Sequence, residues 1–126
     1  GNMDSHAKNL SLLTMGGHTR LAPFYDLVCT TVYKHLSRRF AFKIGGENRP
    51  GWMMGRHWDR LAVELAVKPQ LLLTIRLDIC LRIERELPKV AGALRAQVAH
   101  REGLAMIGLV EAEIRRCTGQ VVARTA

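Results

Sequence analysis

The spacing of apolar residues divides the chain into a polar, turn-rich first third and a helical remainder. From about Met54, a repeat at i, i+3, i+4, i+7 and i+8 predicts a helix that buries one face. The residues of that face are Trp58, Leu61, Ala62, Leu65 and Ala66. Pro69 then suits the first turn of a new helix, because the amide that a proline lacks would have no helical partner there.

This second helix is predicted to run to about Leu87, with apolar side chains on more than one side. One stripe holds Leu72, Ile75, Ile79 and Ile83, and another holds Leu73, Leu77 and Leu81. Such a broad apolar surface is typical of a helix in the core of a bundle. Pro88 should end or kink the helix. Apolar spacing then resumes at Val90, Leu94 and Val98.

A last helix is predicted from about Glu102 to Cys117. Its apolar residues are Leu104, Ile107, Val110 and Ile114. The pair Thr118-Gly119 predicts its end, since glycine readily adopts the left-handed conformation that closes helices. The tail after Gly119 is expected to fray.

The first third of the chain predicts a β-hairpin that follows an irregular polar loop, residues 1–9. The run 9–14 reads as a strand, and Gly16-Gly17 supplies the positive φ that tight turns need. A second strand returns over 19–22, and Pro23 stops it because proline cannot donate to a ladder.

Two further segments are less regular. Residues 27–39 stay ambiguous, because their β-branched side chains weaken a helical interpretation. The period-two run 40–44, followed by Gly45-Gly46, suggests a second small hairpin or an ordered flap. Together the patterns predict one mainly α domain over residues 1–126 with a small β-hairpin portion. Its parts would be the loop and hairpin 1–26, a flap region 27–52 and a helical bundle 53–126.

Composition narrows the classes of function. The formal charge is +8, with 19 Lys and Arg against 11 Asp and Glu. A basic chain suits phosphate-bearing ligands, nucleic acid or an acidic protein, and the scattered charges favour none of these strongly. Cys29, Cys80 and Cys117 are too widely spaced for a zinc site or a disulfide framework. No signal peptide or membrane span is expected, so we predict a cytoplasmic protein without a membrane partner.

Candidate chemistry gathers around the hairpin. Asp4 and Asn9 lie five positions apart, and Asp26 follows 17 residues after Asn9. A hairpin brings its two ends together, so the oxygens of Asn9 and Asp26 can meet at one cation. An Asp that orients a hydroxyl, followed by Asn and Asp ligands for Mg²⁺, is the order that phosphoryl transfer by protein kinases requires.

The fuller string resembles one family. The segment 1–13, the segment Arg20–Leu27, the string Phe40–Glu47 and the following His57-Trp58 are similar to the C-terminal lobe of HipA-like serine/threonine kinases. These kinases are toxins of bacterial type II toxin–antitoxin modules. The resemblance implies a kinase C-lobe-like helical domain. Tyr25-Asp26-Leu27 replaces the Asp-Phe-Gly of ordinary protein kinases.

Carried onto this chain, the resemblance implies a role for each of six residues. Asp4 would be the catalytic base, and Asn9 and Asp26 would bind both Mg²⁺ and the nucleotide. His6 and Lys8 would lie beside the phosphates of ATP, and Tyr25 would line the nucleotide site. The implied partners are a protein substrate, in known cases a translation component, and a helix-turn-helix antitoxin through which DNA is reached indirectly.

The resemblance also implies a nucleotide-binding N-terminal lobe, which the 126 residues lack. We therefore expect a fragment that binds ATP weakly and transfers no phosphate alone. The alternative is a non-catalytic helical domain that docks an antitoxin or a DNA complex. Simpler interpretations stay open for single residues: Asp26 could cap the next segment, while His6 and Lys8 could be solvent-exposed loop residues.

Overall fold

The computed structural model describes residues 1–124 and is mainly helical, as predicted. Over those residues it has three α-helices: α1 (Gly55–Glu64), α2 (Pro69–Gln97) and α3 (Arg101–Ala123). Two strands precede them, β1 (Leu12–Met15) and β2 (His18–Leu21). Single 3₁₀ turns lie at Ala7–Asn9, Thr30–Val32 and Pro50–Trp52.

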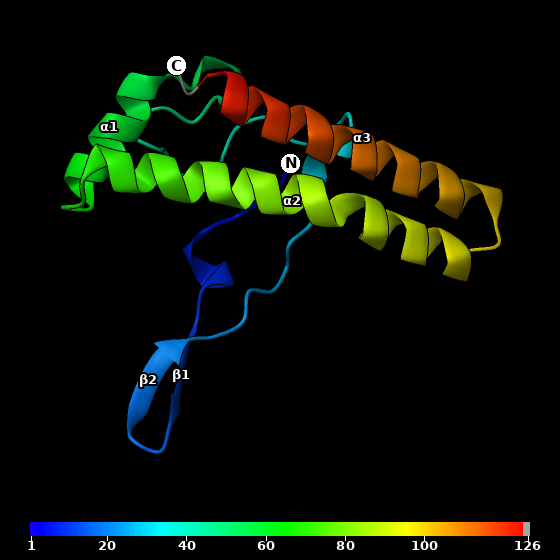
Figure 1. Cartoon of the computed structure of the whole chain (residues 1–126), viewed down its shortest axis with the longest axis horizontal. Helices are drawn as coiled ribbons and strands as arrows, with labels where there is room; N and C mark the ends of the chain where they lie inside the picture. The colour runs from blue at the N-terminus through cyan, green and yellow to red at the C-terminus, as the bar shows by residue number, and fades with distance from the viewer. Residues whose placement is uncertain (125–126) are drawn as a thin grey trace.

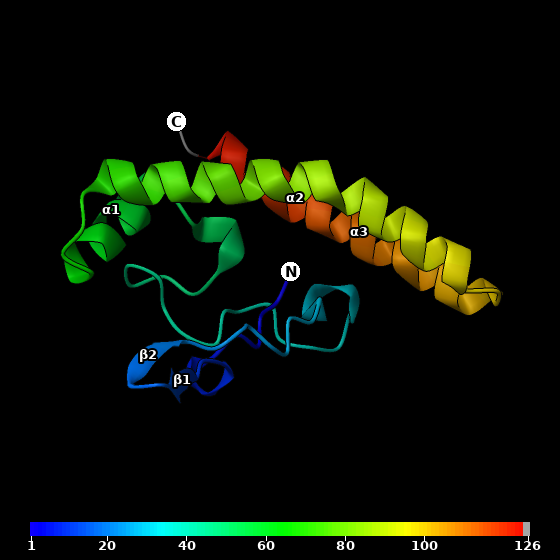
Figure 2. The same cartoon turned by 60° about the horizontal axis from the view of Figure 1, so that its bottom comes forward.

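The helices α2 and α3 form a long antiparallel pair, and α1 lies across one end of it (Figure 1). Two ion pairs join the long helices, Arg95 of α2 with Glu111 of α3 and Glu84 of α2 with Arg115 of α3. Arg115 also pairs with Glu111 within α3. Arg76 of α2 stacks over the ring of Trp58 of α1, 4.1 Å from its centre. The irregular segments before α1 cover one side of the pair (Figure 2).

The hairpin of β1 and β2 projects away from the helices (Figure 1). Its register pairs Leu12 with Leu21 and Met15 with His18. Both turn glycines have positive φ, 56° at Gly16 and 78° at Gly17, so the turn interpretation is confirmed. β1 begins three residues later than predicted, because Asn9 belongs to a 3₁₀ turn instead of extended chain. The end of β1 and both limits of β2 differ by one residue from the prediction.

Two helices continue past their predicted ends, and at Pro88 the kink, one of the two predicted alternatives, occurs (Figure 1). Pro88 lies inside α2, whose axis changes direction in its second half (Figure 1). The helix α2 bends near Pro88 but does not end there, because its packing on α3 outweighs the one backbone hydrogen bond that a proline removes. Likewise α3 continues through Thr118-Gly119 to Ala123, since Thr118 is buried against α2. The helix therefore includes residues 120–123 of the expected tail, while 125–126 lie outside the described residues.

The second small hairpin predicted around residues 40–46 is present only as one antiparallel bridge between Ile44 and Glu47. Gly45, with φ of 54°, lies so close to α1 that a Cβ would stand 1.9 Å from the carbonyl oxygen of His57. The glycine thus permits a close backbone contact. On α1 itself, Ala62 is fully buried, but Leu65 is 57% exposed because the helix ends at Glu64. Ala66 is also exposed, so the predicted face is too long by these two residues.

The apolar core is small. The buried apolar residues among those described are Met3, Met53, Ala62, Cys80 and Ala91. Ile75, Ile79 and Leu81 of the predicted stripes are 46–68% exposed, so the interpretation of those stripes as closed bundle core is wrong for this chain. An open apolar groove of about 890 Å³ lies instead between α2, α3 and the segment 27–33.

Candidate active site

The N-terminal segment is held beside the 3₁₀ turn at Thr30–Val32. The Thr31 amide donates to the Gly1 carbonyl at 3.1 Å, and the Met3 amide donates to the Thr30 hydroxyl at 2.8 Å. Met3 and both threonines are buried. Asp4, the candidate catalytic base, directly follows Met3, so these contacts position the backbone from which Asp4 extends.

Asn9 and Asp26 meet at the base of the hairpin. Asn9 Nδ2 donates to Asp26 Oδ2 at 2.9 Å, and Asn9 Oδ1 accepts from the His6 amide at 2.9 Å. The first contact spans 17 residues, as the hairpin interpretation required. Asn9 is only 9% exposed, so its orientation is set by these contacts rather than by solvent.

Asp26 has an unusual backbone. Its φ of 57° is in the left-handed region, where a residue with a Cβ is uncommon. Its carbonyl accepts from Asn2 Nδ2 at 3.1 Å and from the Val28 amide at 3.0 Å. These contacts hold the turn that aims the carboxylate at Asn9, and strain of this kind is frequent at functional sites.

The other predicted site residues surround this pair. The Tyr25 hydroxyl donates to the Lys8 carbonyl, which ties the two chain segments together. The Asp4 amide donates to Asn2 Oδ1 at 2.9 Å, and Asn2 also bonds Asp26. Asp4 and Lys8 are exposed. Within residues 1–124 no hydrogen bond joins the side chain of His6 to that of Lys8.

One polar atom here has no partner. His6 Nδ1 is buried, and no described residue offers it a hydrogen bond. A buried polar atom left unbonded carries a cost of about 1–3 kcal/mol, so such an atom commonly awaits a water or ligand. His6 follows two residues after Asp4 and donates its amide to Asn9, so the unbonded atom belongs to the same cluster.

The donor set fits Mg²⁺ in part. Asn9 Oδ1 keeps a second lone pair, and Asp26 Oδ1 has no hydrogen bond from a described residue. Two hard oxygens suit Mg²⁺, which usually keeps several waters and binds one or two protein oxygens together with phosphate. Within residues 1–124 no three His, Cys, Asp or Glu side chains gather in a way that could hold a metal. The protein would therefore supply a minority of the ligands.

Sequence reasoning missed the residues that support the site: Asn2, Thr30 and Thr31. Their role depends on contacts across 24 to 30 residues, which no local pattern marks. It also missed Glu113, whose Cγ lies near Gly1. Hydrogen bonds from Arg116 and then from Thr31 lower the pKa of Glu113 to about 2, against 4.5 ordinarily. The carboxylate therefore links α3 to the N-terminal segment.

The structure is a mainly helical domain whose N-terminal loop and hairpin bring the side chains of Asn9 and Asp26 together. The model of the HipA-like C-terminal domain family matches residues 1–87. The chain belongs to this family.

Two known proteins resemble the chain. "Putative kinase Y4mE" of Sinorhizobium fredii (strain NBRC 101917 / NGR234) is 37% identical over 67 residues, which are 53% of this chain and 16% of that protein. A chain of the solved Shewanella oneidensis MR-1 toxin–antitoxin complex of HipA, HipB and operator DNA superposes with a TM-score of 0.89 at 20% identity. That match covers 99% of this chain and 29% of the other. The chain thus spans much less than half of either protein.

No helix in residues 1–124 combines the length and the apolar character that a bilayer crossing would need.

Proposed function

We propose that this chain carries the catalytic base and the metal ligands of a HipA-like, ATP-dependent serine/threonine protein kinase, the toxin of a toxin–antitoxin module. The observation that supports this most directly is the 2.9 Å contact between Asn9 and Asp26 across the base of the hairpin. Membership of the HipA-like family adds to it.

Each site residue has a part in the proposal. Asp4, exposed at the edge of the loop, accepts or orients the proton of the substrate hydroxyl. Asn9 and Asp26 present their remaining oxygens to Mg²⁺, which when bound neutralises charge on the transferred phosphoryl group. His6 and Lys8 lie on the same loop and contact the phosphates, while Tyr25 fixes the loop through the Lys8 carbonyl.

Phosphoryl transfer also requires groups that hold ATP on the side opposite these residues. In kinases those groups come from a nucleotide-binding lobe. We propose that such a lobe completes the site and that the 126-residue chain alone binds ATP weakly without turnover. The proposed setting is the bacterial cytoplasm, with a helix-turn-helix antitoxin, indirect contact to DNA and a protein substrate of the translation machinery.

A thermal-shift measurement tests the site. ATP with Mg²⁺ at about ten times the dissociation constant should stabilise the chain by roughly 1.4 kcal/mol, and ATP without Mg²⁺ should do so less. Asp26→Ala should remove the effect because it deletes a metal ligand. Asp78→Ala is the matched control, since Asp78 is an exposed carboxylate on α2 that pairs with Arg82. Stabilisation by ATP that survives Asp26→Ala would contradict the proposal.

A second candidate is a non-catalytic domain that binds a partner protein. The open apolar groove of about 890 Å³ along α2 and α3 favours it, because large apolar hollows commonly receive partners. Under this proposal the chain would bind an antitoxin or a DNA-bound complex, with salt-sensitive affinity and no response to nucleotide.

A further inference from the structure

A second, smaller cavity borders the N-terminal segment, since Gly1, Met3 and Thr31 contribute to its wall. It has a volume of about 420 Å³ and lies between the segment 38–53, α1 and the last turns of α3. Phe40, Ile44 and Met53 form part of its wall. None of the six predicted site residues lines it. A recess of this size is large enough for one bulky side chain or a small ligand.

Guanidinium groups border this apolar recess. Arg38, Arg116 and Arg124 line it. Arg116 pairs with Glu113 at 2.7 Å, and Arg124 Nη1 donates to the Pro50 carbonyl at 3.0 Å. Arg38 is exposed and makes no ion pair with any described residue. The recess therefore combines an apolar interior with one available positive charge at its edge.

The positive charge extends beyond the recess along the segment 34–43. That segment contains Lys34, Arg38, Arg39 and Lys43 and no acidic residue. All four are exposed, and none pairs with a carboxylate among residues 1–124. Elsewhere the basic residues of α2 and α3 often have acidic neighbours, such as Arg82 with Asp78 and Lys89 with Glu86. The segment 34–43, called the basic strip below, thus carries four exposed positive side chains without an acidic partner among the described residues.

We infer that this surface binds an acidic segment of a partner protein that inserts one large apolar side chain into the 420 Å³ recess. Carboxylates of the segment would lie along Arg38, Arg39 and Lys43, where no internal acid competes for them. An extended charged strip beside a single recess matches a peptide better than a small anion, which would leave most of the strip unused. Buried anchors with a charged rim are the usual design of such contacts.

Nucleic acid fits the same surface less well. A duplex presents phosphates along its length and gains nothing from an apolar recess. Leu36 and Phe42, exposed by 41% and 51%, interrupt the basic residues of the strip. These side chains suit a protein partner, whose apolar groups can cover them.

Fluorescence anisotropy with the 126-residue chain tests the inference. The probe is a labelled acidic peptide of roughly twelve residues with one central Trp, compared with the same peptide carrying Ala in that position. The Trp peptide should bind about tenfold more tightly than the Ala peptide, and added salt should weaken both. A labelled DNA duplex of equal charge serves as the competing ligand and should bind more weakly than the Trp peptide.

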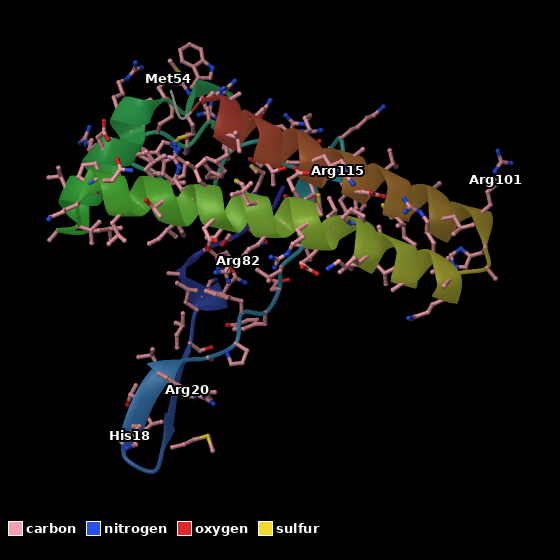
Figure 3. The ribbon with its side chains drawn as sticks, in the orientation of Figure 1. His18, Arg20, Met54, Arg82, Arg101 and Arg115 are labelled. Carbon is pink, nitrogen blue, oxygen red and sulfur yellow. The ribbon has the colours of Figure 1, made fainter. Side chains whose placement is uncertain are left out.

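Protein variants separate the strip from the recess. Arg38→Glu with Arg39→Glu should weaken the Trp peptide at least about tenfold. Arg20→Glu with Arg101→Glu makes the same change of charge at distant exposed sites (Figure 3) and should have little effect. Gly51→Phe should weaken the Trp peptide and not the Ala peptide, because Gly51 lines the recess and a Cβ there meets nothing within 4 Å. Gly92→Phe, equally unobstructed on α2, is the control.

Four results would overturn the inference: no peptide binding, equal binding of the Trp and Ala peptides, indifference to Arg38→Glu with Arg39→Glu, or tighter binding of the duplex. Circular dichroism of each variant shows whether it is folded. If Gly51→Phe unfolds the chain, Gly51→Leu makes the same test with a smaller side chain. None of these measurements depends on ATP, so they are independent of the kinase proposal.

Discussion

The hairpin with its loop and the α2–α3 pair are held together by different means. All eight strand residues of the hairpin are exposed, and backbone hydrogen bonds with a few polar contacts define its shape. The helix pair has buried positions, such as Cys80, Ala91 and Thr118, together with ion pairs between the helices. We infer that global stability depends on the helices, whereas the geometry of Asn9 and Asp26 depends on local contacts at the hairpin base.

The largest effect should come from a charge placed between the helices. Ala91 on α2 is 3% exposed, so Ala91→Glu buries a carboxylate without a partner and should cost about 3 kcal/mol or more. Ala93, exposed on the same helix, is the matched site, and Ala93→Glu should change little. Urea unfolding followed by circular dichroism measures both. Equal stability of the two variants would contradict the role given to the helix interface.

A buried hydroxyl should have the next largest effect. Thr118 donates to Glu84 of α2 and approaches the Ile114 carbonyl at 3.2 Å. Thr118→Val removes the hydrogen-bond donor from the half-buried carboxylate of Glu84 and should lower the free energy of unfolding by about 1–2 kcal/mol. Thr74→Val is the control, because among residues 1–124 the Thr74 hydroxyl bonds only its own helix, at the Gln70 carbonyl. If Thr74→Val lowered stability as much as Thr118→Val, the effect would come from helix propensity and not from the bond to Glu84.

The same threonine shows where sequence reasoning reaches its limit. Thr118-Gly119 has the local chemistry of a helix end. The helix nevertheless continues, because Thr118 bonds Glu84, 34 residues away. The meeting of Asn9 and Asp26 could be predicted because two glycines define the hairpin between them. The left-handed backbone of Asp26 and the pairing of Gly1 with Thr31 could not be, since both depend on contacts between distant segments.

The connection between the two regions predicts a pH dependence. The pKa of Glu113 is lowered to about 2 by Arg116 and Thr31, so the stability it contributes is complete above about pH 4.5 and is lost as pH falls through about 2. Because Arg116 is half exposed, we expect about 1 kcal/mol rather than the full linkage value. Glu113→Gln should therefore be less stable than the parent at about pH 6 and equal to it near pH 2.

Glu64→Gln provides the control for this measurement. Glu64 pairs with Arg60 within α1, and both side chains are largely exposed, so the change should cost only a few tenths of a kcal/mol at either pH. Thermal unfolding at about pH 2, 4 and 6 gives the comparison. A difference between Glu113→Gln and the parent that persists unchanged near pH 2 would show that the carboxylate charge is not what connects α3 to the N-terminal segment.

The smallest effect on global stability should come from the hairpin turn. Gly17 has φ of 78°, and a Cβ at this position would meet no atom within 4 Å, so Gly17→Ala costs only backbone strain, about 1 kcal/mol. That cost falls on a hairpin that opens separately from the helices, so the melting temperature should shift by roughly 1 °C or less. Amide exchange in β1 and β2 should become about fivefold faster, because about 1 kcal/mol corresponds to that factor. A fall in melting temperature as large as that of Thr118→Val would show that the hairpin unfolds with the helices, and the site could then not be treated as locally determined.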